Sequence, residues 1–166
     1  KNHVDIGSTY EMSGYLSKII PTTFIDIRPL DVKLKNLTVI DASILSLPYD
    51  DDSLESLFSL HVIEHIGLGR YGDSVEPDSW IAACMELARV FAKDGRLYIS
   101  VPVGIPKVCF NAHRIFSPDK LPQVFKKLKL EQFSFVDDRG LLFENCGLKD
   151  ACTQQYACGF YLFRKT

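Results

Sequence analysis

Apolar positions in the first quarter of the chain gather into three short stretches, each of which ends at an acidic residue. These residues are Asp5, Asp26 and Asp41. Apolar runs of this length, followed by a carboxylate and a turn, are typical of buried parallel strands whose carboxyl ends carry polar groups. Because ligands bind outside these ends in an open parallel sheet, the three acids predict one nucleotide-like ligand.

The rest of the pattern predicts more strands and helices in alternation. Residues 80–92 have helical periodicity, with one apolar face formed by Ile81, Cys84, Met85, Ala88 and Phe91. A short helix is expected over residues 11–20, and a third opens at Ser117-Pro118 and runs to about residue 127. Further strands are expected over residues 54–60, 96–102, 130–136 and 155–164. This order predicts an α/β protein with a Rossmann-like, doubly wound sheet of about seven strands, mostly parallel, with an antiparallel strand near the C-terminus.

Composition adds limits on domain number and partners. The 166 residues predict a single domain over residues 1–166, and the net charge of −2 predicts no binding to nucleic acid. Apolar stretches are too short to span a bilayer and no signal peptide is visible, so a cytoplasmic location is expected. Since the first residue is lysine and lies at the edge of a strand, we also expect an N-terminal segment to be missing upstream.

The sequence contains candidate metal ligands, but their spacing does not favour a metal site. The five cysteines lack CxxC spacing, which predicts reduced thiols. Residues 61–65 spell HxxEH, the inverted zinc-protease motif, but zinc needs both histidines on one helix face. Here the motif straddles the predicted end of a strand, so a metal-dependent hydrolase is kept only as a remote alternative. Asp137-Asp138 is similar to a divalent-metal pair, but an exposed turn before Gly140 is the preferred interpretation.

Several of these segments resemble the class I methyltransferases that use S-adenosylmethionine. The resemblance covers residues 3–102 and rests on an ordered set of motifs: VDIGS (4–8), FIDIRP (24–29), DA (41–42) with LPY (47–49), ELARVF (86–91) and GRLYISVP (95–102). A narrower resemblance covers nearly the whole chain. The segments at residues 64–73, 110–114 and 136–140 are similar to a small uncharacterised family of methyltransferase relatives, a domain of unknown function.

The resemblance implies roles for the residues at the strand ends. Asp26 would accept both ribose hydroxyls of the cofactor, although it could instead pair with Arg28 or cap a turn. Asp41 would accept from the adenine amino group while the backbone of Ala42 meets the ring, and its alternative is to cap the following loop. Asp5 is expected to order the first loop rather than to contact the ligand directly. The full set of expected S-adenosylmethionine residues is Asp5, Gly7, Ser8, Asp26, Ile27, Asp41, Ala42 and His61.

Candidate catalytic residues lie on the expected acceptor side. A hydroxyl acceptor needs a base, and His113, in a polar loop after the fifth strand, is the first candidate because its reference pKa is near 6.5. His65 and Asp73 are the other candidates, with Asp73 orienting His113 or the acceptor. The structural alternatives are that Glu64 and His65 pin their loop, and that Asn111, His113 and Arg114 tie two loops together.

The function that follows is methyl transfer from S-adenosylmethionine to a small, hydroxyl-bearing acceptor, for which a carbohydrate is one candidate. The alternative is a methyltransferase-like binding or scaffold domain without turnover. After Gly7 the next glycine is Gly14, so the loop has fewer glycines than the family's pattern, and this favours the alternative.

Overall fold

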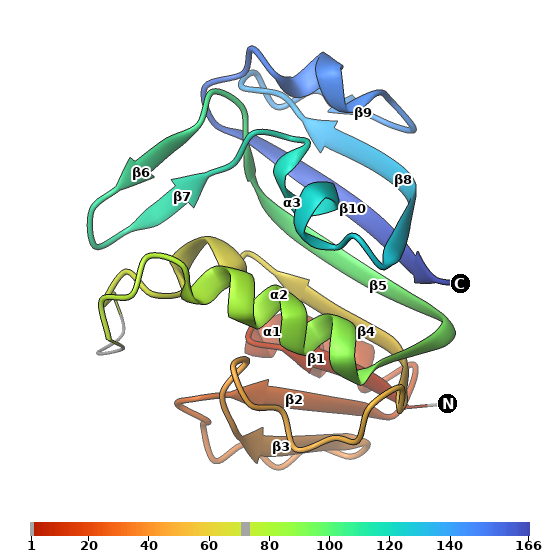
Figure 1. Ribbon diagram of the computed structural model, residues 1–166. Coiled ribbons are helices and arrows are strands. Elements are labelled where there is room, and N and C mark those ends of the chain that lie inside the picture. Colours follow the sequence, from red (N-terminus) through yellow and green to blue (C-terminus); the bar gives the residue numbers. More distant parts are fainter. Residues whose placement is uncertain (1, 71–73) are drawn as a thin grey trace.

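The computed structural model describes residues 2–70 and 74–166, and its main feature is an eight-stranded sheet of order β3-β2-β1-β4-β5-β10-β8-β9 (Figure 1). Five neighbouring strands are parallel: β1 (His3–Ile6), β2 (Thr22–Asp26), β3 (Leu37–Asp41), β4 (Leu54–Leu60) and β5 (Phe91–Val103). The others pair antiparallel: β8 (Leu128–Val136), β9 (Leu142–Phe143) and β10 (Ala157–Lys165). The predicted Rossmann-like sheet is therefore confirmed, with the two-residue β9 as an additional strand.

The strand order reverses beside β1, and this determines where a ligand can bind. From β1 the chain builds β2 and β3 on one side of the sheet and then returns to place β4 and β5 on the other. Connections on the two sides of this point leave the sheet in opposite directions, which opens a crevice at the carboxyl ends of β1 and β4.

Helices cover both faces of the sheet. In Figure 1, α2 (Ser79–Val90) and α3 (Lys120–Val124) lie in front of the sheet and α1 (Tyr10–Leu16) lies behind it. Two short 3₁₀ helices, η1 (Ile63–His65) and η2 (Leu148–Ala151), lie in the connections. In the part of the chain that the structure describes, no helix is long and apolar enough to cross a membrane.

The buried face of α2 differs from the expected one by a small rotation. Its buried residues are Trp80, Ala83, Cys84, Leu87 and Val90, whereas Met85 is 67% exposed. The expected face omitted Trp80, whose ring packs against Phe116 at 5.0 Å between centroids. The large aromatic side chain at the start of the helix thus determines which stripe faces the core.

Several element ends differ from the sequence prediction. α1 ends at Leu16 rather than near residue 20, and α3 begins at Lys120 rather than at Pro118. β5 begins at Phe91, immediately after α2, and its pairing with β4 shifts register before Arg96. Residues 93–95, directly after the helix expected over residues 80–92, form part of an irregular start of this strand, with Asp94 at a φ of 60°.

Two predicted loops are structured in ways that the sequence analysis missed. The polar loop after β5 is a hairpin of β6 (Lys107–Cys109) and β7 (His113–Ile115), so His113 lies on a strand. Asp137 was expected in an exposed turn but its side chain is 4% exposed. Its carboxylate accepts backbone N–H bonds from Leu141 and Arg139, both at 2.9 Å, and these bonds hold its pKa below the usual range.

Candidate functional site

A cavity of about 530 Å³ opens at the crevice beside β1, and its wall includes the carboxyl ends of β1 and β2 and the residues after β3 and β4. Six of the eight expected cofactor residues line it: Gly7, Ser8, Asp26, Ile27, Ala42 and His61. Of the expected catalytic residues, His65 also lines it. The topology thus brings together side chains from four connections that are far apart in sequence.

Asp5 supports the cavity wall from behind. It is fully buried, and one carboxylate oxygen accepts from the backbone N–H of Ser8 at 3.3 Å and from the Ser8 hydroxyl. The other oxygen accepts from the hydroxyl of Ser13 in α1. Burial raises the pKa of Asp5 to about 6, although the bonds from Ser13 and Ser8 oppose the shift. Asp5 thereby fixes the position of Ser8, which faces the cavity.

Gly7 forms a tight turn between β1 and α1. Its φ is +71°, which is the left-handed region that favours glycine, and a Cβ there would lie 3.2 Å from Cγ1 of Val62. Two residues later Thr9 caps α1, since its hydroxyl accepts from the N–H of Met12 at 3.2 Å. A single glycine is sufficient for this turn, because the residues after Gly7 lead directly to Thr9, the N-cap of α1.

Asp26 places a carboxylate at the end of β2 with one oxygen already in use. Its Oδ1 accepts from the backbone N–H of Arg28 at 2.7 Å, so the expected alternative of capping a turn is part of what it does. Beside it lies Tyr10, a cavity residue that the sequence analysis missed. The Tyr10 hydroxyl accepts from the N–H of Leu30 and donates to the carbonyl of Arg28, which holds the segment after β2 against α1.

Asp41, the third strand-end acid, lies outside the cavity wall. Its side chain is exposed and its backbone is paired in register with Asp26. Ala42 follows it into the wall, and its N–H donates to the carbonyl of Asp26 at 3.3 Å. The structure therefore brings Ala42 to the cavity but not the Asp41 carboxylate.

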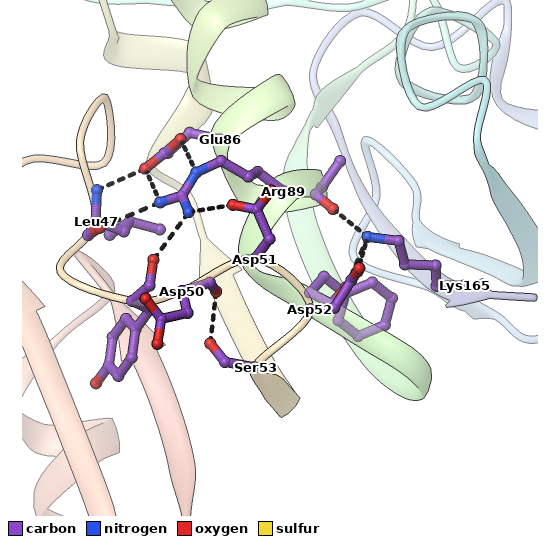
Figure 2. A network of polar contacts seen from close by, with 11 residues as sticks. Leu47, Asp50, Asp51, Asp52, Ser53, Glu86, Arg89 and Lys165 are labelled. Carbon is purple, nitrogen blue, oxygen red and sulfur yellow. Dashed lines mark hydrogen bonds and ion pairs between the residues drawn. The ribbon is translucent and has the colours of Figure 1, made fainter.

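The loop between β3 and β4 is held to α2 by Arg89 (Figure 2). The guanidinium donates to both carboxylate oxygens of Glu86, at 2.7 and 2.8 Å, and to the carboxylate of Asp51 at 2.8 Å. It also donates to the carbonyls of Leu47 and Tyr49, while Glu86 accepts from the N–H of Leu47 at 2.7 Å. Since this loop begins in the cavity wall, α2 determines the position of that part of the wall.

A cluster of imidazoles lies around one buried carboxylate in the connection that follows β4. Glu64 is 1% exposed, and its Oε1 lies 3.0 Å from Nδ1 of His61 and 3.9 Å from Nε2 of His65. His61 follows β4 with a φ of 57°, and its ring contacts Glu64 in η1. The expected loop-pinning role of Glu64 is thus present in the geometry, and both histidines also reach the cavity.

The β6–β7 hairpin is attached to this cluster through its backbone. The Ala112 carbonyl lies 2.6 Å from Nδ1 of His65 and accepts from Arg70 at 3.1 Å. Arg114, which is 6% exposed, donates to the carbonyls of Glu64, Ile66 and Pro77 at 2.7–3.3 Å. Of the three residues expected to tie two loops together, Arg114 does so by these bonds, and the carbonyl of Ala112 adds a further contact. The signal for it was an arginine directly before the apolar pair Ile115-Phe116.

His113 lies beside the cluster rather than in the cavity wall. Its ring centroid is 6.5 Å from that of His65 and 5.1 Å from that of Tyr156. Burial, followed by the nearby His65, lowers its pKa. Asp73, the third catalytic candidate, lies outside the described residues.

The sequence matches one family model over residues 28–155, which is more than three quarters of the chain. The family is described as "Caenorhabditis protein of unknown function, DUF268". The chain belongs to this family. The narrower resemblance to an uncharacterised family is therefore confirmed, and no curated protein matches the DUF268 chain.

Solved structures that resemble the DUF268 chain include class I methyltransferases, and they show its fold. The [4+2]-cyclase SpnF has a TM-score of 0.73 and 13% identity, over 99% of this chain and 75% of that chain. The 1,6-didemethyltoxoflavin-N1-methyltransferase of Burkholderia thailandensis, with bound S-adenosylhomocysteine, has a TM-score of 0.65 and 13% identity, over 99% and 71%. The N-methyltransferase NodS of Bradyrhizobium japonicum, also with S-adenosylhomocysteine, has a TM-score of 0.63 and 13% identity, over 99% and 78%.

In the described part of the chain, no set of side chains supports the zinc alternative. Over residues 2–70 and 74–166, no group of three or more His, Cys, Asp and Glu side chains is arranged to hold a metal ion. His61 and His65 of the HxxEH segment converge on Glu64 itself, whereas the zinc motif needs both histidines to converge on a metal.

Proposed function

We propose that the chain binds S-adenosylmethionine in the 530 Å³ cavity and transfers its methyl group to a small, hydroxyl-bearing acceptor. The observation that carries the proposal is the position of the cavity, at the point where the strand order reverses, with the Asp26 carboxylate in its wall. Its volume is within the range of small-molecule sites. The neighbours crystallised with S-adenosylhomocysteine support this choice of cofactor.

The residues present fit such a cofactor in three respects. Gly7 leaves space beside Val62 that a Cβ would narrow, which allows close approach to the backbone. Only one oxygen of Asp26 has a described hydrogen-bond donor, so the other can accept from ribose hydroxyls. Exposed apolar side chains in the wall, including Ile27, Leu30 and Leu45, offer a surface for a flat ring.

The cavity residues would position the acceptor and take up its proton. When bound, the cofactor would supply an electrophilic methyl group on a sulfonium sulfur. Nδ1 of His65 donates to the Ala112 carbonyl, so the neutral ring carries its basic lone pair on Nε2. Because His65 lines the cavity, we place the general base there and assign His113 to the support of its ring. A carbohydrate is the first acceptor class to test.

Calorimetric titration of S-adenosylmethionine into the full chain tests the cofactor, with Asp26→Ala beside the exposed control Asp31→Ala. Removing charge-assisted bonds worth about 1.5–3 kcal/mol each should raise the Kd of the Asp26 variant by about 10- to 150-fold per bond lost. The control should bind like the original chain. Absence of saturable binding to the folded chain would overturn the proposal.

Methyl transfer is tested separately, with labelled S-adenosylmethionine and a panel of hydroxyl compounds that includes carbohydrates. Transfer that His65→Asn abolishes while cofactor binding is retained would support the general base. Binding without transfer to any member of the panel would instead assign the chain to the alternative, a binding or scaffold domain.

A further inference from the structure

Three side chains from two distant parts of the sequence form a line of contacts at the edge of the cavity. Sγ of Cys158, in β10, lies 3.2 Å from Nε2 of His61, and Nδ1 of the same ring lies 3.0 Å from Oε1 of Glu64. Cys158 and His61 are 97 residues apart. A thiol, an imidazole and a carboxylate in this order have the geometry of a nucleophile, its base and the group that orients the base.

The burial of Glu64 favours a protonated His61. Glu64 is 1% exposed, and within the described residues its Oε2 has no hydrogen-bond partner. A buried carboxylate needs a nearby positive charge, and the imidazoles of His61 and His65 lie 3.0 and 3.9 Å from its Oε1. The contacts with Cys158 and with Glu64 raise the pKa of His61 to about 10, against the effect of burial.

Nε2 of His61 lies 3.2 Å from the sulfur of Cys158, so a protonated ring places a positive charge directly beside this sulfur. The other titratable groups around the sulfur are less directly placed. Burial, followed by the charges of Glu64, Cys109 and Cys158, raises the pKa of Tyr156, two residues before it, and Arg70 opposes this shift. Cys158 is partly exposed and the His61 side chain is 47% exposed, so small reagents have access to the pair.

We propose that Cys158 is a nucleophilic thiolate, activated by His61 and oriented through Glu64, and that it is a site of oxidation by hydrogen peroxide. The sulfur attacks one peroxide oxygen, an S–O bond forms and the O–O bond breaks. The second oxygen leaves as hydroxide and takes the proton of the His61 imidazolium to become water. The sulfur loses two electrons and becomes a sulfenic acid.

This modification site goes beyond the proposed methyl transfer, because it needs neither cofactor nor acceptor. Oxidation of Cys158 also affects the cavity wall, because His61 lines the cavity and loses its charged sulfur partner when Cys158 is oxidised. Reduction by a small thiol would restore the original pair.

The first test is alkylation of the full chain with iodoacetamide between pH 5.5 and 9, with the rate at each cysteine read by mass spectrometry of peptides. Cys152 is exposed and serves as the control within the same molecule. An ordinary thiol of pKa near 8.5 is about 1% thiolate at pH 6.5. Cys158 should therefore react at least about tenfold faster than Cys152 at this pH. Equal rates and equal pH profiles at the two cysteines would overturn the proposal.

The second test changes the imidazole. His61→Asn suits the left-handed backbone at this position, because asparagine tolerates a φ near 57°. In this variant the rate at Cys158 should fall about tenfold at pH 6.5, while the rate at Cys152 stays unchanged. After peroxide, a 1,3-diketone probe should label Cys158 in the original chain and not in His61→Asn or Cys158→Ser. Unchanged reactivity in His61→Asn, or labelling that persists in Cys158→Ser, contradicts the assignment.

Discussion

Replacing Asp5 by asparagine should remove a pH dependence of stability that the buried carboxyl imposes. In the folded chain its pKa is about 6, compared with an ordinary value of 3.8, because burial disfavours the charge. The folded state therefore holds the proton more tightly than the unfolded state between about pH 4 and 6. The favourable contribution of Asp5 is fully present below pH 4 and is lost as the pH rises through 6.

The shift gives the size of the effect. Two pKa units correspond to about 3 kcal/mol, which is the free energy that ionised Asp5 subtracts from folding at pH 7. Asparagine keeps the shape, its oxygen can accept both bonds from Ser8, and its amide group can donate to the Ser13 hydroxyl. The variant should thus match the original chain near pH 4 and exceed it by about 3 kcal/mol at pH 7.

Urea unfolding between pH 4 and 8 measures this difference, and the fluorescence of the single tryptophan, buried Trp80, reports the transition. Asp31→Asn, on an exposed loop, controls for the loss of one negative charge. If the difference in the free energy of unfolding between the Asp5 variant and the original chain stayed constant with pH, the reasoning would be refuted. An equal pH dependence in the Asp31 variant would refute it as well.

Two other substitutions test the cavity wall. Gly7→Ala should lower the free energy of unfolding by about 1–2 kcal/mol, because alanine is strained at a φ of +71°. The control Gly14→Ala, within α1, should be neutral or stabilising. Urea unfolding measures both variants, and equal effects on the free energy of unfolding would argue against a strained turn at Gly7. Arg89→Lys should lower the Tm and weaken S-adenosylmethionine binding, since lysine cannot reproduce the hydrogen bonds to Glu86 and the β3–β4 loop. Scanning calorimetry measures the Tm and calorimetric titration measures the binding, with Arg96→Lys, at an exposed position, as the control. The same Tm and Kd in the two variants would contradict the prediction.

The sequence predicted the strands well because each is a dense apolar run with a clear stop. β2, β3 and β4 end where expected, at Asp26, Asp41 and Leu60. The β6–β7 hairpin was missed because each of its strands has three residues, too few for a periodicity to show. Its turn was recognisable only as a polar segment containing Asn111, whose φ is 49°.

The site was predictable where one residue follows a strand and not where two distant segments meet. Asp26 and Gly7 could be placed from local motifs alone. The contact between His61 and Cys158 depends on β10 lying beside β5, and β5 beside β4, so no local pattern indicates it. Tyr10 was missed because the helix was expected to begin one residue later, at Glu11.

The position of β10 in the sheet has a consequence for synthesis on the ribosome. Residues 157–165 are made after every other strand of this sheet, yet they pair with β5 on one side and β8 on the other. Until they emerge, the nascent chain carries two open strand edges rich in buried aliphatic and aromatic residues, a state prone to aggregation. A chain truncated before residue 157 would therefore lose the strand that joins the two parts of the sheet, and with it the thiol that lies beside His61.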